Sequence, residues 1–276
     1  MTMLCNISNL LKKIRLVKDA YQFIHYYDFE KMLHINCENK SVLDKNRVDI
    51  ITVAFNNDKV IRQQIRLLNK YILDSYYYTV ADNSSDPTKQ DEIAQICNQF
   101  EVSYIRLPRN PYNEISPSLS HGIALNWLYK NYVSPRKATF FGFIDHDIFP
   151  VRPTTIINYL KSSNVYGLVQ EREQMWYLWP GFCFFSYAFV KGCKVDFMPI
   201  KGCDTGGGNW HPIYSSMNRE MIPQVKHEYR NLRNGGDPQG DLVEYIGDWL
   251  HTFNASKWKK VNKGKDLLVD KLLKEY

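Results

Sequence analysis

Residues 139–144 form a short apolar and aromatic run that ends abruptly in two carboxylates, Asp145 and Asp147. Such a run is typical of a strand that is buried on both faces of a sheet. In open α/β sheets, ligands bind in the crevice at the carboxyl ends of the strands. Carboxylate oxygens at that position suit Mg²⁺ or Mn²⁺, either of which can bridge a diphosphate. The sequence therefore predicts a divalent-cation site at this strand end.

Strand and helix patterns alternate from residue 48 onward. This alternation predicts βαβ units, and hence an α/β fold with a mostly parallel central sheet flanked by helices. After Pro150 the pattern is less regular, and we expect strands near residues 165–170 and 181–189 and a helix at 242–253. In the regular part, the predicted strands are residues 48–55, 76–81, 102–107 and 139–145, and the predicted helices are residues 60–72, 91–100 and 119–131.

The chain divides into three predicted parts. Residues 1–47 form an N-terminal helical extension, residues 48–256 the main domain with halves at 48–150 and 151–256, and residues 257–276 a basic C-terminal tail. Between residues 10 and 18, branched aliphatic side chains interleave with lysine and arginine, as in a basic amphipathic helix. Such a helix could lie on an anionic membrane, or pack on the main domain with its basic face in water, and we prefer packing.

Composition and charge narrow the class of protein. The formal charge of +6 is too small and too scattered for a nucleic-acid-binding protein. The six cysteines include no CxxC pair, which favours reduced thiols over a disulfide scaffold or a zinc site. The N-terminal residues lack a signal-peptide pattern, and no stretch reaches the roughly 18 apolar residues that span a bilayer. We therefore expect a cytoplasmic protein, with at most peripheral contact at the inner face of the membrane.

The polar ends of three predicted strands, taken in order, resemble the nucleotide-sugar-binding half of glycosyltransferases with the GT-A fold, most closely family 2. The first element is residues 54–57 (Ala-Phe-Asn-Asn), the second is residues 82–84 (Asp-Asn-Ser), and the third is residues 145–147 (Asp-His-Asp). Residues 110–126 also look like the family's helix that begins beside the diphosphate. The likeness covers roughly residues 48–150.

The resemblance implies a nucleotide diphosphate sugar donor and a Mn²⁺ or Mg²⁺ ion held by the Asp-x-Asp pair. Asp147, at the strand exit, is the better metal ligand, Asp145 contacts ribose or a metal-bound water, and strand alternation points His146 to the opposite side. The guanidinium of Arg109 could pair with phosphate. The nucleotide-sugar-binding residues predicted in this way are Ala54, Phe55, Asn56, Asp82, Asn83, Arg109, Gly122, Asp145 and His146.

Each of these elements also has a purely structural interpretation. Asp145 and Asp147 could form a turn with solvated carboxylates, and Asp82 could cap an Asx turn. Arg109 could equally be an ordinary surface charge. These alternatives stay open at the level of sequence, because the spatial neighbours of each side chain decide between them.

The second half is expected to bind the acceptor and supply the base. In inverting members of the resembled family, a carboxylate beyond the Asp-x-Asp strand deprotonates the acceptor hydroxyl. Asp204 is the candidate, although the family's usual Glu-Asp pair is absent and a plain turn residue is the alternative. The glycines at 206–208 could bring backbone N–H groups close to a ligand. Some GT-A enzymes take a third metal ligand from a C-terminal histidine, a role open to His251 or His211.

The predicted function is transfer of a sugar from a nucleotide diphosphate sugar to a saccharide or lipid-linked acceptor, in the assembly of a surface polysaccharide. Inversion by direct displacement is preferred over retention. A sugar nucleotidyltransferase is a rival, but it would carry a Gly-rich, Arg/Lys-bearing loop after the first strand, where this chain has Asn56 and Asn57. A catalytically inactive glycan-binding module that uses Trp176, Trp179 and Trp210 is the rival from another class.

Overall fold

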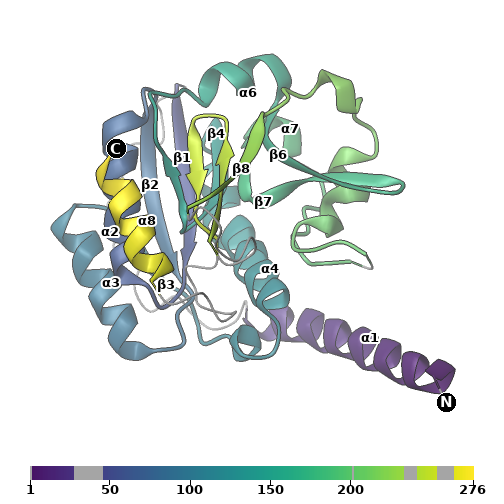
Figure 1. Ribbon diagram of the computed structural model, residues 1–276. Helices are drawn as coiled ribbons and strands as arrows, with labels where there is room; N and C mark the ends of the chain where they lie inside the picture. The colour runs from purple at the N-terminus through teal and green to yellow at the C-terminus, as the bar shows by residue number, and fades with distance from the viewer. Residues whose placement is uncertain (1, 28–45, 201, 233–240, 254–263) are drawn as a thin grey trace.

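A six-stranded sheet forms the centre of the computed structural model, which describes residues 2–27, 46–200, 202–232, 241–253 and 264–276 (Figure 1). In spatial order, the first four strands run parallel to one another. The fifth strand pairs antiparallel with the fourth, and the sixth pairs antiparallel with the fifth. The predicted α/β fold with a mostly parallel central sheet, flanking helices and an N-terminal helix is confirmed. In spatial order the strands are β3 (Ser103–Arg106), β2 (Ser75–Asp82), β1 (Arg47–Ala54), β4 (Phe140–Asp145), β7 (Met175–Ser186) and β6 (Val165–Arg172).

Strand β4 is buried on both faces, as its composition predicts. Phe141 and Phe143 enter one half of the core, while Phe140 and Ile144 enter the other. This division follows from the strand period of two, which sends successive side chains to opposite faces. The strand therefore has no solvent-facing side, and Asp145 is the first charged residue where it leaves the core.

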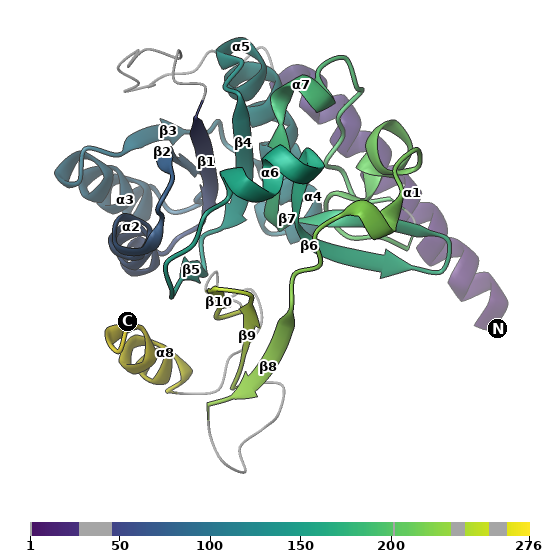
Figure 2. The same cartoon turned by 90° about the horizontal axis from the view of Figure 1, so that it is seen from above.

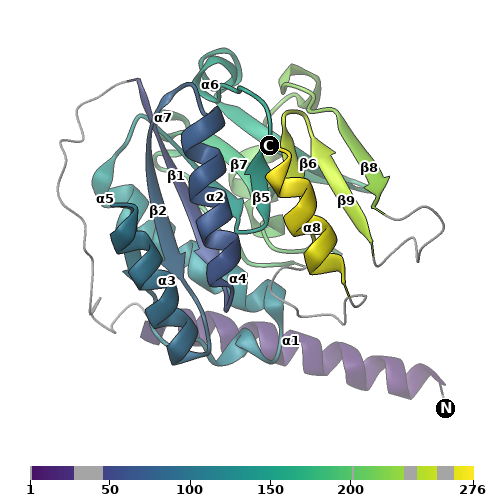
Figure 3. The same cartoon turned by 60° about the vertical axis from the view of Figure 1, so that its left-hand side comes forward.

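Helices cover both faces of the central sheet. Helix α2 (Asp58–Tyr71) and helix α3 (Pro87–Gln99) lie side by side on one face (Figure 3), and α4 (Pro117–Leu128) lies on the other. Each begins at a side chain that accepts a hydrogen bond from the first turn: Asn57, Asp86 and Ser116. These caps place the helix starts at the same edge of the sheet as the carboxyl ends of β1, β2 and β3.

A second, four-stranded sheet comes from the less regular part of the chain. The predicted helix at 242–253 is wrong, because these residues form two strands joined at Gly247, whose φ of 58° favours a tight hairpin turn. Figure 2 shows this sheet on the same side of the central sheet as the C-terminal helix. In spatial order its strands are β5 (Ile148–Pro150), β10 (Trp249–His251), β9 (Leu242–Ile246) and β8 (His227–Asn231).

The last described segment packs on the domain. Helix α8 (Lys265–Lys274) lies beside α2 (Figure 3), where Leu273 is buried in a small core with Leu67 and Phe149. The guanidinium of Arg66 donates to the carbonyl of Leu273 over 2.7 Å. The sequence predicts a separate basic tail at 257–276, but this part of it belongs to the fold of the main domain, and residues 257–263 lie outside the described residues.

The N-terminal helix α1 (Thr2–Tyr27) packs on the domain through its second half. Ala20 is fully buried, the ring of Phe23 contacts that of Tyr112, and the hydroxyl of Tyr21 donates to Asp196 over 2.6 Å. Its other half extends away from the domain (Figure 1), so the preferred interpretation of packing holds for the second half of the helix, where Leu16 and Val17 contact the core, and not for the first. Among the described residues, no helix is both long and apolar enough to cross a bilayer.

Short elements complete the described fold. They connect the strands and carry several residues that are discussed below. The α-helical ones are α5 (Ser134–Arg136), α6 (Ile157–Ser163) and α7 (Tyr187–Val190), the 3₁₀ turns are η1 (Pro111–Asn113), η3 (Gly207–Asn209) and η5 (Arg219–Met221), and the π-helical turns are η2 (Tyr129–Val133) and η4 (Trp210–Tyr214).

Candidate functional site

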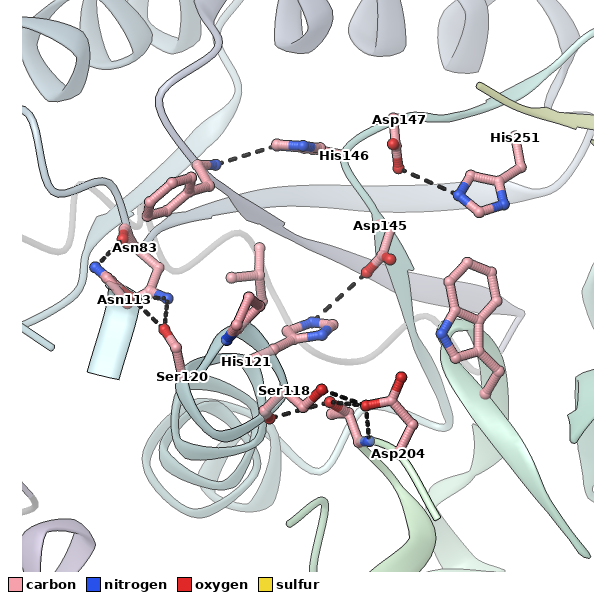
Figure 4. A pocket seen from close by; sticks show the side chains of 15 residues that line it. Asn83, Asn113, Ser118, Ser120, His121, Asp145, His146, Asp147, Asp204 and His251 are labelled. Carbon is pink, nitrogen blue, oxygen red and sulfur yellow. Dashed lines mark hydrogen bonds and ion pairs between the residues drawn. The ribbon is translucent and has the colours of Figure 1, made fainter. Parts of the chain in front are cut away.

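The main pocket opens where the strand order of the central sheet reverses, between β1 and β4. Val53 and Asp145 are paired neighbours at this point. A reversal of strand order leaves a crevice at the carboxyl ends, which is where open α/β sheets bind ligands. The pocket has a volume of about 300 Å³ and is lined by Val53, Phe55, Asn83, Asn113, Pro117, Ser118, Ser120, His121, Asp145, His146, Asp147, Trp179, Asp204, Thr205 and His251 (Figure 4).

Asp145 faces helix α4 across the pocket. Its Oδ1 lies 3.6 Å from Nε2 of His121, and Figure 4 shows both side chains turned toward the same space. Burial raises the pKa of Asp145 above its ordinary value, with His121 opposing this shift and the carboxylate of Asp147 adding to it. The pocket therefore holds several titratable side chains close together. A bound cation would stabilise the ionised form of the carboxylates.

Asp147 pairs with His251, the last residue of strand β10. The two residues are 104 positions apart in the sequence, from 147 to 251. Asp147 Oδ1 lies 3.7 Å from His251 Nε2, and both side chains are almost fully buried. The opposite ring nitrogen, Nδ1, lies 3.1 Å from a carboxylate oxygen of Glu244. Burial alone would lower the pKa of His251, but the carboxylates of Asp147, Glu244 and Asp145 together raise it.

His146 supports the loop that follows β1. Its Nδ1 accepts a hydrogen bond of 3.1 Å from the backbone N–H of Phe55. Burial lowers the pKa of His146, so the ring is neutral and Nδ1 can accept. The expectation that this ring points to the side opposite Asp145 and Asp147 is wrong: it lines the same pocket, because the chain turns directly after Asp145 and strand alternation ends there.

The loop after β1 is fastened to the loop after β2. The N–H of Asn56, which has a positive φ of 48°, donates to the hydroxyl of Ser84 over 2.7 Å. Ala54 is fully buried at the strand end, and its carbonyl accepts from the N–H of Asn83. Phe55 and Asn83 reach the pocket, whereas Ala54 and Asn56 shape the loops behind it.

A buried amide network lines the floor of the pocket. The side-chain amide of Asn83 donates to Asn113 Oδ1 over 3.2 Å and to the hydroxyl of Ser120 over 2.9 Å. Asp82, by contrast, is fully buried and turned away: its Oδ1 accepts from the N–H of Ser84, and its Oδ2 accepts from the hydroxyl of Tyr104. Asp82 thus makes the contact of an Asx turn, its structural role, rather than a contact with the pocket.

Arg109 lines a second pocket that adjoins the first at Asn113. This pocket has a volume of about 1000 Å³ and also contains Arg106, Gln90 and Ser84. Gly122, on α4, lies away from both pockets. A Cβ atom added there would come within 3.0 Å of the carbonyl oxygen of Phe197, so this glycine lets helix and loop approach closely.

Asp204 reaches the main pocket from the segment that packs over the start of α4. Its Oδ1 accepts hydrogen bonds from the hydroxyl of Ser118 and from the N–H of Thr205, and Figure 4 shows the carboxylate facing the space beside His121. Chain segments from both halves of the domain thus meet in one site, although Asp204 and Asp145 are far apart in the sequence.

The glycines at 206–208 serve packing, so the prediction that they offer N–H groups to a ligand is wrong. The three N–H groups donate to the carbonyls of Phe197, Asp204 and Met198, respectively. A Cβ atom at Gly206, where φ is 91°, would lie 2.6 Å from Cγ of Pro180. Tight turns and close contacts within the protein account for this run.

Several pocket residues are absent from the sequence-based prediction: Asn113, Ser118, Ser120 and His121. Three of them lie in the first two turns of α4, a helix that is otherwise mostly apolar and buried. Polar side chains three residues apart, as in Ser118 and His121, share one helix face. Polar residues confined to the start of a buried helix are a signal that could have identified this side of the pocket.

A divalent cation fits the donors around Asp147. Among the described residues, no three His, Cys, Asp or Glu side chains already stand together as a metal-binding group. However, Asp147 and His251 supply an oxygen and a nitrogen of the kind that Mn²⁺ accepts, and Glu244 binds the outer nitrogen of the histidine, as outer carboxylates do in many metal sites. His211 lies outside this pocket.

Comparison with known proteins gives partial structural likenesses. No protein-family model and no curated protein matches the sequence. Among solved structures, S. aureus TarS aligns at 16% identity and a TM-score of 0.37, over 55% of this chain and 30% of TarS. The mannosyltransferase PcManGT from Pyrobaculum calidifontis, solved with GDP-Man and Mn²⁺, aligns at 11% identity and a TM-score of 0.40, over 64% of this chain and 56% of its own. The mannosyltransferase Ktr4p from S. cerevisiae aligns at 9% identity and a TM-score of 0.38, over 64% and 67%. The chain thus spans less than two thirds of the first two proteins, and likenesses at this level are silent on activity.

Proposed function

We propose that this protein is a metal-dependent glycosyltransferase that moves a sugar from a nucleotide diphosphate sugar to a saccharide or lipid-linked acceptor. The observation that carries the proposal is the convergence of Asp145, Asp147, His251 and Asp204 on one pocket at the point where the strand order reverses. Carboxylates in this arrangement can hold a cation beside a diphosphate donor and can take the proton of a hydroxyl acceptor.

The two adjoining pockets offer room for the donor. The larger one contains Arg106 and Arg109, whose guanidinium groups can pair with phosphate, together with polar side chains that can contact a base or ribose. The smaller one contains the Asp147 and His251 pair. A nucleoside in the larger pocket would direct its diphosphate past Asn113, which lines both, toward the carboxylates.

Asp147 and His251 would hold a Mn²⁺ or Mg²⁺ ion, with Asp145 close to its bound water or to the donor ribose. Two protein ligands are enough, because such ions are commonly held by one or two carboxylates together with substrate phosphates. When bound, the cation supplies positive charge that stabilises the diphosphate as the bond to the anomeric carbon breaks. His121 lies next to Asp145, where a protonated imidazole would face the same phosphates.

Asp204 is proposed as the base. The hydrogen bonds that Ser118 and Thr205 donate to its carboxylate all go to Oδ1, which fixes the group in the pocket. The acceptor hydroxyl would transfer its proton to Asp204 as its oxygen attacks the anomeric carbon, and the nucleoside diphosphate would leave from the opposite side. This direct displacement inverts the configuration of the sugar.

The proposed setting is surface polysaccharide assembly in the cytoplasm, at the inner face of the membrane. Leu11 and Ile14 are 60% and 56% exposed on the part of α1 that extends from the domain. Lys12, Lys13 and Lys18 are beside them, so that both apolar contact and attraction to anionic lipid are available. Peripheral contact of this kind would bring the pocket close to a lipid-linked acceptor.

Release of nucleoside diphosphate from a panel of nucleotide sugars tests this function. With Mn²⁺ present, we expect wild type to release product from one class of donor, faster with a suitable acceptor, and Asp147→Ala to lose this release. Asp270→Ala, on α8 and outside both pockets, is the matched control and should behave as wild type. If release is independent of Mn²⁺ and equal in Asp147→Ala, the proposed site is wrong.

A further inference from the structure

Glu244 is a buried carboxylate that two imidazole rings share. It is 3% exposed, on strand β9 between the buried Val243 and the half-buried Tyr245. One oxygen lies 3.1 Å from Nδ1 of His251, and the other lies 3.4 Å from Nδ1 of His227. A buried carboxylate costs free energy unless it is paired, and the two imidazoles, together with a hydrogen bond from the side chain of Tyr229 on β8, offset this cost for Glu244.

The contact with Glu244 determines which nitrogen of His251 can bind a cation. An ionised carboxylate only accepts hydrogen bonds, so Nδ1 of His251 carries the hydrogen in this contact. A neutral imidazole with its hydrogen on Nδ1 has its lone pair on Nε2. Nε2 is the atom that lies 3.7 Å from Asp147 in the main pocket. Glu244 thereby turns the metal-binding lone pair toward Asp147.

The surroundings of His251 keep the ring in this orientation. Glu244 and His251 stand directly opposite each other on the paired strands β9 and β10. The ring also contacts those of Trp179 and Phe253, at centroid distances of 4.9 and 4.1 Å. Packing therefore restricts rotation of the ring, and the hydrogen bond selects its tautomer.

We infer that Glu244 is a positioning residue, which fixes His251 as an Nε2 donor for the divalent cation and so sets the affinity of the site for that cation. The inference rests on the proposed function, in which His251 is a metal ligand. His227 pairs with the other oxygen of Glu244 and is half-exposed, so it contributes less. Outer carboxylates of this kind typically change metal affinity by about 10- to 100-fold when they are removed.

The test combines two measurements on the full chain. Nitrogen-15 NMR of the imidazoles without metal, at a pH at which the ring of His251 is neutral, reports its tautomer, and a His251→Gln variant assigns the signal. Titration with Mn²⁺ in the presence of a nucleoside diphosphate reports affinity. Glu244→Leu removes the acceptor. Glu244→Gln keeps a neutral acceptor and provides a second test in case Glu244→Leu does not fold. His227→Gln, which changes the other imidazole at Glu244, is the control.

In wild type we expect hydrogen on Nδ1 of His251, and a mixture of tautomers in Glu244→Leu. The Mn²⁺ affinity should fall about 10- to 100-fold in Glu244→Leu, by less in Glu244→Gln, and by no more than about threefold in His227→Gln. Wild-type affinity and tautomer in Glu244→Leu would overturn the role of Glu244 while leaving the proposed function intact. A wild type with hydrogen on Nδ1 that binds no Mn²⁺ with any nucleotide would overturn the proposed function and, with it, this role.

Discussion

His251 Nε2 lies 3.7 Å from Asp147 Oδ1, although the two residues are 104 positions apart in the sequence, from 147 to 251. The hairpin of β9 and β10 makes this contact, because β10 pairs with β5, the short strand that directly follows Asp147. The second sheet therefore serves the site by placing one histidine beside the carboxylate at the exit of β4.

Asp204→Asn should slow sugar transfer without weakening donor binding. The asparagine can still accept the hydrogen bond of Ser118, but it cannot take a proton from the acceptor. General-base catalysis is typically worth about 10²- to 10⁴-fold in rate, so we expect a loss in that range, with nucleotide affinity close to that of wild type. Asp270→Ala serves as the control. A variant that retains the wild-type rate would remove Asp204 from the mechanism.

Gly181→Ala should disturb the pocket through Trp179. A Cβ atom at position 181 would lie 2.3 Å from Cζ2 of Trp179, whose ring lines the pocket and contacts His251. We expect a loss of about 1–3 kcal/mol in the free energy of unfolding from overpacking, and weaker stabilisation by nucleotide. Chemical denaturation and thermal shift measure the two effects.

The double variant Gly181→Ala with Trp179→Phe provides the rescue, since the smaller ring leaves room for the added methyl group. It should regain part of the lost stability. No difference between Gly181→Ala and wild type in either measurement would mean that the position of the Trp179 ring is not fixed by Gly181.

Asp82 should matter for stability, and its effect should depend on pH. Asp82→Ala leaves the Ser84 N–H without its acceptor, at a cost of about 1–3 kcal/mol for a buried group left unpaired, and leaves the Tyr104 hydroxyl only its longer contact of 3.3 Å with the carbonyl of Gln90. Asp82→Asn keeps an acceptor and should cost less.

The sign of the pH effect follows from burial, which raises the pKa of Asp82 in the folded protein. A raised folded pKa favours folding at low pH, and this contribution is lost as the pH rises from about 4, the ordinary aspartate value, through the folded pKa. Wild type should therefore lose stability relative to Asp82→Asn between low and neutral pH. Denaturation curves that keep a constant difference would contradict this.

The exposed apolar residues of α1 should matter for membrane contact. Leu11→Ser combined with Ile14→Ser should reduce co-sedimentation with vesicles that contain anionic lipid, and salt should reduce the binding of wild type by screening. Leu267→Ser, which changes an even more exposed leucine on α8, is the matched control. Equal binding of the double variant and wild type would argue against α1 as the contact.

The first half of the fold follows from sequence, because β1, β2 and β4 are marked by short apolar runs that end in polar residues. The second half was harder to predict. Residues 242–253 have the composition of a helix as much as of two short strands, and the turn at Gly247 is the deciding signal. Glu244 and His121 became recognisable only in space, since their roles depend on His251 and Asp145, which are distant in the chain.

Thermal unfolding with UDP, GDP and CDP, each with and without Mn²⁺, tests the central claim most directly when wild type is compared with Asp147→Ala. A ligand that binds only the folded state raises the unfolding temperature by mass action. We predict a rise with one nucleotide that requires Mn²⁺ and that Asp147→Ala abolishes, whereas Asp270→Ala retains it. No rise with any nucleotide, or a rise that Asp147→Ala preserves, would contradict a metal-dependent nucleotide-sugar site at this pocket.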